Sequence, residues 1–289
     1  MKSLIINSSN LVSTGFNNQY KYVFPTGSVR FENDQMAVSS INMFFSWFNI
    51  TGSTDGTQYN NNQFSYVWYY GATSTTVNIN ISTGYYTISS LNQYCQSIMI
   101  QNGHYLITAS GQYVFYLEFV ENSTYYGVQF NSYPIPTSLP VGYTAPGSWP
   151  GFPTTATTPQ IIISSSNNFK DILGFNAGTY PSVVQNSNYS KISDYTPTLN
   201  PSSSLLMTCN ILDNKISLPS GLLYSFTSGS TAFGGMIDIK PPQYSFIDIQ
   251  NGSYTDFIIT FYDSSFRNIK IQDTNVCILL TIRNKKETP

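Results

Sequence analysis

Apolar and polar residues alternate along most of this chain. Alternation with a period of two, rich in aromatic and β-branched residues, is typical of β-strands that bury one face. The pattern predicts strands over residues 41–48, 63–70, 75–81, 113–120, 160–164, 205–212, 257–262, 268–271 and 276–282. Short polar turns separate the last three segments, so we expect these to form a meander. The pattern therefore predicts an all-β protein built as an antiparallel β-sandwich.

One segment, residues 87–102, has a different period. Apolar side chains recur there at the three- and four-residue spacing of an amphipathic helix, namely Ile88, Leu91, Cys95 and Ile98. Thr87 is suited to cap the amino end of such a helix, and Gly103 stands where a glycine commonly follows the carboxyl end. We expect one helix on the flank of the sandwich, and a second short helical turn over residues 169–173.

Residues 134–159 contain seven prolines with Thr, Gly and Ser between them. Proline has no backbone N–H to donate, so this composition is typical of an extended connection. The segment could be a long insertion loop or a linker between domains. We expect a single domain over residues 1–289 with residues 1–35 as an N-terminal arm, although the pattern also allows a second small β domain.

Charged residues make up only 9% of the chain, against about 25% in typical soluble domains. Polarity comes instead from residues such as Asn, with 28 copies, and Tyr, with 23. A protein that stays monomeric usually carries a charged surface, and aromatic side chains are enriched at protein interfaces. The composition favours a subunit with large polar and aromatic contact surfaces. An AT-rich genome would produce the same bias without such surfaces.

The distribution of charge and cysteine limits the classes of partner. No Lys or Arg occurs between Arg30 and Lys170, whereas a nucleic-acid binder needs clustered cations, so we expect no specific nucleic-acid binding. The basic residues near the carboxyl end are expected on a frayed, solvated terminus.

No apolar run reaches the roughly 18 residues of a membrane helix, and the apolar start is too short for a signal peptide. We expect no membrane insertion and synthesis in a reducing compartment. The cysteines are odd in number and lack a C-x-x-C pair, which argues against a disulfide framework: Cys95, Cys209 and Cys277.

Candidate catalytic and ligand-binding residues are few. The single histidine, His104, cannot build a zinc site alone. We expect it to be bonded locally near the helix end, so that its replacement by Ala costs at most about 1 kcal/mol. The glycine-rich segment 228–235 lacks the Lys of a phosphate-binding loop. Four aspartates could in principle supply a carboxylate pair for glycoside hydrolysis, but Asp at strand ends commonly caps the backbone: Asp238, Asp248, Asp256 and Asp263. We expect no catalytic residue, no cofactor and no metal.

Two regions carry a family resemblance. Residues 84–92 read Gly-Tyr-Tyr-Thr-Ile-Ser-Ser-Leu-Asn, and residues 173–175 read Leu-Gly-Phe. The second region comprises residues 249–263, 269–273 and 278–282. Together they cover about half of the chain and resemble the penton, or minor capsid, proteins of virophages and Polinton-like viruses, and more distantly those of large eukaryotic DNA viruses.

The resemblance implies a jelly-roll subunit that forms homopentamers at the five-fold vertices of an icosahedral capsid. There it would be surrounded by trimers of a double-jelly-roll major capsid protein. The protein would then be a structural component of the virion, made in the cytoplasm of the host cell, and not an enzyme. The family offers no catalytic residue to transfer. The alternative is a β-sandwich carbohydrate-binding or adhesin module that stacks sugars on exposed aromatic residues, for which the candidates are Trp47, Trp68, Tyr69 and Tyr70.

Overall fold

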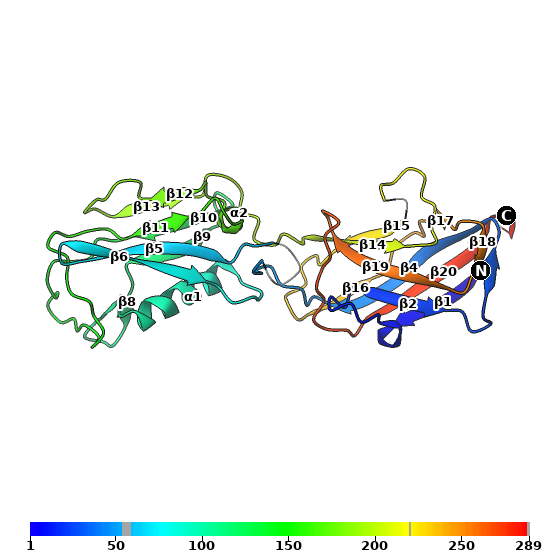
Figure 1. The fold of residues 1–289 in the computed structure, drawn as a ribbon, viewed down its shortest axis with the longest axis horizontal. Helices are drawn as coiled ribbons and strands as arrows, with labels where there is room; N and C mark the ends of the chain where they lie inside the picture. The colour runs from blue at the N-terminus through cyan, green and yellow to red at the C-terminus, as the bar shows by residue number, and fades with distance from the viewer. Residues whose placement is uncertain (54–58, 220, 288–289) are drawn as a thin grey trace. The chain divides into compact units, whose positions relative to one another are not determined.

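The computed structural model describes residues 1–53, 59–219 and 221–287. The chain forms two compact units. Figure 1 colours them by residue number, from blue at the N-terminus to red at the C-terminus. Unit 1 comprises residues 1–47 and 201–289, and unit 2 comprises residues 48–200. The chain thus does not form the single domain expected over residues 1–289. The second unit is as substantial as the first, and its boundaries do not lie at residues 134–159.

Unit 1 is a jelly roll made of two antiparallel sheets, one of five strands and one of four. The first sheet has the order β1 (Lys2–Asn7), β20 (Cys277–Asn284), β4 (Asp34–Phe44) and β16 (Met236–Ile239). The second has the order β2 (Gln19–Val23), β19 (Asp256–Asp263), β14 (Ser204–Cys209) and β15 (Leu222–Thr227). Along the chain, the first of these eight strands pairs with the eighth, the second with the seventh, the third with the sixth and the fourth with the fifth. This nested pairing is a long hairpin rolled into a sandwich, the arrangement of a jelly roll.

Smaller elements complete unit 1. Strand β17 (Ile247–Asp248) pairs with β4, and β18 (Gly252–Tyr254) pairs with β3 (Val29–Phe31). Two short 3-10 helices, η1 (Ser8–Asn10) and η2 (Lys285–Glu287), follow β1 and β20. The predicted strand over residues 205–212 corresponds to β14, and the one over residues 41–48 corresponds to the second half of β4.

Strands β19 and β20 both lie inside the sandwich, as the sequence predicted. Phe257 and Phe261 of β19 and Ile278 and Leu280 of β20 are fully buried. The predicted meander is wrong, because β19 and β20 belong to different sheets. Residues 268–271 form the crossing between them and contain no regular strand. Their alternating pattern arises because this loop buries Ile269 and Ile271 and leaves Asn268 exposed, without forming a regular strand.

Residues 1–35 are not an arm. Strand β1 pairs with β20 along all six of its residues, and β2 pairs with β19. Ile6 and Tyr20 are fully buried in the core of unit 1. Strands β1 and β2 are short and have many exposed polar positions. Their alternation of apolar and polar residues was therefore too weak to predict them.

Unit 2 is inserted between β4 and β14, the third and fourth strands of the jelly roll. One of its sheets has the order β12 (Gly178–Tyr180), β11 (Gln160–Ile163), β5 (Gln63–Tyr70) and β6 (Thr73–Asn80). The other has the order β13 (Tyr189–Ile192), β10 (Gly127–Ser132) and β9 (Leu117–Asn122). A small ribbon joins β7 (Leu106–Ile107) to β8 (Tyr113–Val114). The sheets meet across a core in which the rings of Phe64 and Phe119 lie 5.8 Å apart.

Both predicted helices are confirmed in unit 2. Helix α1 (Ile88–Gln101) is capped at its amino end by Thr87, whose hydroxyl accepts a hydrogen bond from the Ser90 backbone N–H. It buries one face and ends before Gly103, whose φ of +72° suits glycine. Helix α2 (Phe169–Leu173) is the short second turn.

The Pro-rich segment is an insertion within unit 2 and does not link the two units. Ile135 forms a β-bridge with Thr157, and Thr144 forms another with Ile107. The connections between the units lie instead at residues 47/48 and 200/201. Proline prevents regular pairing here, so the segment attaches to unit 2 through single bridges and aromatic contacts such as that of Trp149 with Trp68.

Candidate functional site

His104 follows α1 and lies inside unit 2. Its side chain is only 3% exposed and stacks on the indole of Trp68 at 4.4 Å between ring centres. The Tyr66 hydroxyl lies 2.8 Å from His104 Nδ1, so one of these two groups donates to the other. Burial lowers the pKa of His104 to about 4 and keeps the imidazole neutral at pH 7. The residue is therefore part of the core of unit 2.

The aromatic residues proposed as a sugar platform do not form one. Trp47 is 1% exposed and donates its indole N–H to the Ser202 carbonyl at 3.3 Å, while Trp68 is fully buried. Tyr69 and Tyr70 are half-buried and pack against the core of unit 2, and the Tyr69 hydroxyl donates to Gln160 Oε1 at 2.5 Å. A stacking platform needs an exposed ring face, and neither tryptophan has one. The alternation of β5 places the Trp68 indole in the core of unit 2, and Trp47 is buried in unit 1 just after the end of β4.

The four candidate aspartates each bind a different basic side chain. Asp238 pairs with Lys240 at 3.2 Å, Asp248 with Lys285 at 2.7 Å, Asp256 with Lys21 at 3.3 Å and Asp263 with Arg267 at 2.7 Å. The hydrogen bond from Lys285, followed by that from Gln35, holds the pKa of Asp248 below its usual range. Asp263 is fully buried and also accepts the backbone N–H groups of Ser265 and Arg267. All four carboxylates therefore have structural partners.

The remaining candidates also have structural environments. Cys95 and Cys209 are buried and Cys277 is exposed, each as a free thiol. Burial raises the pKa of both buried thiols to about 12, which leaves them protonated at neutral pH. Across residues 1–53, 59–219 and 221–287, no three His, Cys, Asp or Glu side chains gather closely enough to hold a metal ion. In those same ranges no helix has the length and apolar character to cross a bilayer. The glycine-rich segment forms the turn between β15 and β16, where Gly234 N–H donates to the Phe45 carbonyl.

The motif residues at 84–92 and 173–175 organise unit 2. Asn92 on α1 accepts the backbone N–H of Phe119 at 2.9 Å and thereby attaches the helix to β9. Gly174 ends α2 with φ of +75°, and a Cβ atom there would lie 2.2 Å from the Tyr195 carbonyl oxygen. Leu173 and Phe175 are buried on either side of it. These motif residues therefore have structural contacts within unit 2.

One organising residue, Asn49, was missed by the sequence reasoning. Its fully buried side chain accepts the Tyr86 N–H at 2.8 Å and donates to the carbonyls of Tyr86 and Leu199 at 2.7 and 2.9 Å. It therefore ties the first residues of unit 2 to its last. The chain has 28 asparagines, and no local pattern distinguishes a buried Asn that joins two segments from an Asn on the surface.

The basic residues near the carboxyl end are engaged in contacts, contrary to the expectation of a frayed terminus. The Arg283 guanidinium lies 3.7 Å from the centre of the Phe246 ring, and its Nε donates to Gln35. Arg267 and Lys285 form the ion pairs with Asp263 and Asp248 described above. Strand β20 carries Arg283 into the sheet, so these cations contribute to the end of the jelly roll.

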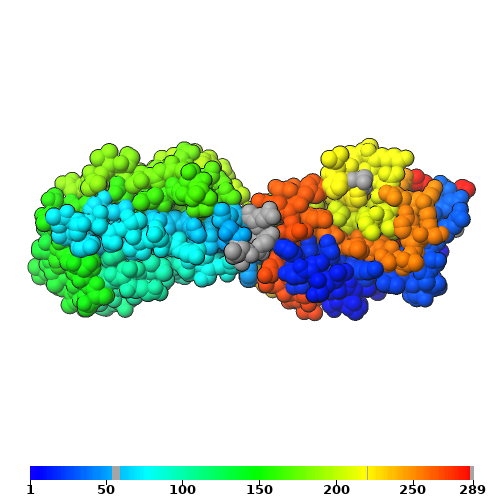
Figure 2. Space-filling model, viewed as in Figure 1, coloured from blue at the N-terminus to red at the C-terminus, as the bar shows by residue number. Residues whose placement is uncertain are grey.

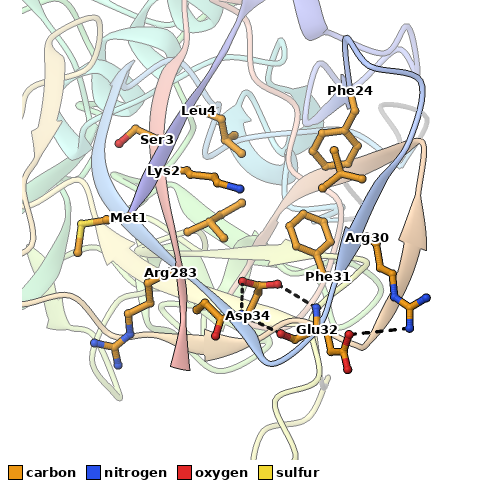
Figure 3. A pocket seen from close by; sticks show the side chains of 13 residues that line it. Met1, Lys2, Ser3, Leu4, Phe24, Arg30, Phe31, Glu32, Asp34 and Arg283 are labelled. Atoms are coloured by element: carbon orange, nitrogen blue, oxygen red, sulfur yellow. Dashed lines mark hydrogen bonds and ion pairs between the residues drawn. The ribbon is translucent and has the colours of Figure 1, made fainter. Parts of the chain in front are cut away.

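A pocket of about 490 Å³ lies at this end of unit 1, between β1, β3 and the end of β20 (Figure 3). Its apolar wall includes Phe24 and Phe31, whose rings are 5.8 Å apart. At its rim, Arg30 lies 3.8 Å from Glu32. Asp34 accepts the Glu32 N–H and the Asn284 side-chain amide at 2.9 and 3.2 Å. The carboxylates of the pocket are thus already paired, and we find no set of groups converging on one reacting atom.

The surface outside this pocket displays apolar side chains in both units. In unit 1 the exposed set includes Ile5, Val23, Ile216, Leu218, Met236 and Phe266, and in unit 2 it includes Tyr113, Tyr125, Tyr126, Val141, Val183 and Val184. Charge, which normally keeps a protein monomeric, is scarce on the surface that carries these side chains, as expected of a protein that associates.

Comparisons with known proteins give structural matches alone. No family model matches the sequence, and no curated protein matches it. Among solved structures, the mavirus penton protein is similar at 10% sequence identity with a TM-score of 0.44, covering 98% of this chain and 99% of that one. A chain from the structure of the Sputnik virophage is similar at 12% identity with a TM-score of 0.38, covering 99% of both chains.

Proposed function

We propose that this chain is a structural virion protein, a penton subunit that assembles as a homopentamer at the five-fold vertices of an icosahedral capsid. In this role it contacts a double-jelly-roll major capsid protein, resides in the virion after synthesis in the host cytoplasm, and catalyses no reaction. It inserts into no membrane and binds no specific nucleic-acid sequence. The observation that carries the proposal is a jelly roll with little charge and many exposed apolar side chains.

Jelly rolls occur in viral capsids, lectins and cupins, and the residues of this chain favour the first. A cupin site holds its metal with several histidines inside the jelly roll, whereas the single histidine here is buried in unit 2. A lectin of the kind considered above needs exposed indoles, and Trp47 and Trp68 are buried. The motif resemblance of residues 84–92, 173–175, 249–263, 269–273 and 278–282 adds independent support for a penton subunit.

The mass of the purified protein in solution tests the proposal. The subunit mass is 32.3 kDa, and we expect an equilibrium between monomer and a species of five subunits that shifts to the larger species as concentration rises. A ring that fills a five-fold vertex closes only if each contact rotates the next subunit by one fifth of a turn, so five subunits are the predicted endpoint. Because few ion pairs are available to screen, salt between about 0.05 and 0.5 M should change the equilibrium little. A stable trimer or dimer as the largest species would contradict the proposal.

A further inference from the structure

Strand β6 is an unprotected sheet edge. It pairs with β5 along all eight residues without a register shift, and it is the last strand of its sheet. From Thr73 to Asn80 it contains neither a charged residue nor a proline. Natural proteins usually guard edge strands with charge, proline, bulges, short length or a covering element, and β6 has none of the first four. Figure 2 shows the segment that contains it, in cyan, on the viewed face of unit 2.

The other edges of unit 2 are protected. Strand β12 has three residues and is followed by Pro181, and β13 has four residues and carries Lys191. Strand β9 is packed against α1, as the Asn92 bond to Phe119 shows, and it carries Glu118 and Glu121. In unit 1, β15 is uncharged but its pairing with β14 is interrupted by a register shift. The contrast indicates that the exposure of β6 is a specific feature.

The hairpin geometry identifies the backbone groups that face outward. Tyr70 and Thr73 pair across a two-residue turn whose first residue, Gly71, has φ of +53°. In such a hairpin the residues flanking the turn form a hydrogen-bonded pair, and the pairs alternate from there. The N–H and C=O groups of Thr73, Thr75, Val77 and Ile79 therefore point to β5, and those of Ser74, Thr76 and Asn78 point away. The Tyr94 hydroxyl donates to the Asn80 carbonyl at 3.0 Å, in keeping with this alternation.

Helix α1 meets this edge at the carboxyl end of β6, where its Tyr94 hydroxyl donates to the Asn80 carbonyl. Tyr94, which reaches the end of β6, and Ile98, one turn further along α1, are partly buried apolar side chains packed against the core of unit 2. A strand added to β6 would hydrogen-bond to three outward-facing residues, and its end beside Asn80 would meet Tyr94 of α1. In the described part of the chain, no group outside the β5–β6 hairpin hydrogen-bonds to the backbone of residues 73–79.

We propose that the β6 edge receives an extended, uncharged segment from a second copy of this chain, by strand addition. Because the β6 edge carries no charge, an uncharged strand can pair with it without leaving a charge unpaired. The chain itself exposes such a segment. No charged residue occurs from 172 to 190, and within this range Val183 and Val184 are 72% and 56% exposed. The proposal deepens the self-assembly proposed above by naming a surface through which copies meet.

Substitution at Thr76 tests this contact in the full-length chain. Thr76→Pro removes the central outward N–H without removing a bond to β5, and Thr76→Ala is the matched control because it keeps that N–H. We expect Thr76→Pro to weaken self-association at least tenfold and Thr76→Ala to leave it within about twofold. The near-ultraviolet spectrum of the buried tryptophans checks folding. As a second disruption, Asn78→Lys places a charge on the exposed edge, and Thr124→Lys on the exposed β9–β10 turn is its control.

Hydrogen exchange gives the residue-level readout. In dilute monomer, the amides of Ser74, Thr76 and Asn78 should exchange rapidly while those of Thr75 and Val77 are protected. In the assembled state all five should be protected. Assembly into five subunits with the outward amides still unprotected would overturn this inference and leave the proposed function standing. Association through β6 into a dimer would support the β6 contact and contradict the proposed pentamer. Protection of these amides only after a different protein is added would also overturn it.

Discussion

Burial determines the chemistry of His104. The imidazole stacks on Trp68 and bonds to Tyr66 inside unit 2, so its loss would leave a buried hydroxyl without a partner and create a cavity. The cost of His104→Ala is therefore about 2–3 kcal/mol, above the 1 kcal/mol expected when the residue was placed near a helix end. The sequence located the residue correctly after α1 but could not show how deeply the chain folds over it.

The lowered pKa of His104 predicts a loss of stability in acid. The folded-state pKa of about 4 lies below the unfolded value of about 6.5, so protons bind preferentially to the unfolded chain as pH falls below about 6.5. The contribution of neutral His104 to the free energy of unfolding is fully present above that pH and is lost progressively as the pH falls to about 4. We expect unit 2 to lose about 2 kcal/mol between pH 7.5 and pH 5. Urea unfolding at the two pH values measures this.

His104→Asn serves as the control for that measurement, because it removes the titrating group while leaving a polar side chain. The variant will be less stable overall, but the difference between pH 7.5 and pH 5 should largely disappear. An undiminished difference in His104→Asn would show that other groups cause the acid sensitivity.

At the level of elements, the junction after α2 depends on a single glycine. Gly174 adopts φ of +75° with the Tyr195 carbonyl oxygen 2.2 Å from where a Cβ atom would lie. Gly174→Ala should therefore destabilise unit 2 by about 2 kcal/mol or more, from the left-handed backbone together with the close contact. The matched control is Gly147→Ala, since Gly147 has no atom within 4 Å of that position. Equal thermal stability of the two variants would refute this account of the motif.

The elements that sequence reasoning predicted best are those whose signal is local. Helix α1 was predicted from its apolar spacing and its cap, and β5 from uninterrupted alternation. Strands β1 and β2 were missed, because their pairing with β20 and β19 joins residues more than 230 positions apart. Residues 268–271 were misassigned because a buried loop and a strand can share the same alternation. The hydrogen bonds of the buried Asn49 side chain also join residues far apart in the sequence, and no local pattern predicts them.

At the level of the whole molecule, two β units share one chain through two connections. Unit 2 is continuous from residue 48 to residue 200, whereas unit 1 is assembled from both ends of the chain. The jelly roll of unit 1 can close only after its fourth to eighth strands, β14, β15, β16, β19 and β20, have joined β1, β2 and β4. An insertion between the third and fourth strands is compatible with this roll, because it replaces a loop and interrupts no pair. Low charge and exposed apolar side chains in both units favour assembly as the molecule's role.

Direct imaging of the assembled species is the most direct test of that role. The concentrated full-length protein, examined by electron microscopy without imposed symmetry, should show closed rings with five-fold rotational symmetry. Rings of three or six subunits, two-fold dimers, or open filaments would contradict a penton role, since only a five-subunit ring fits a five-fold vertex.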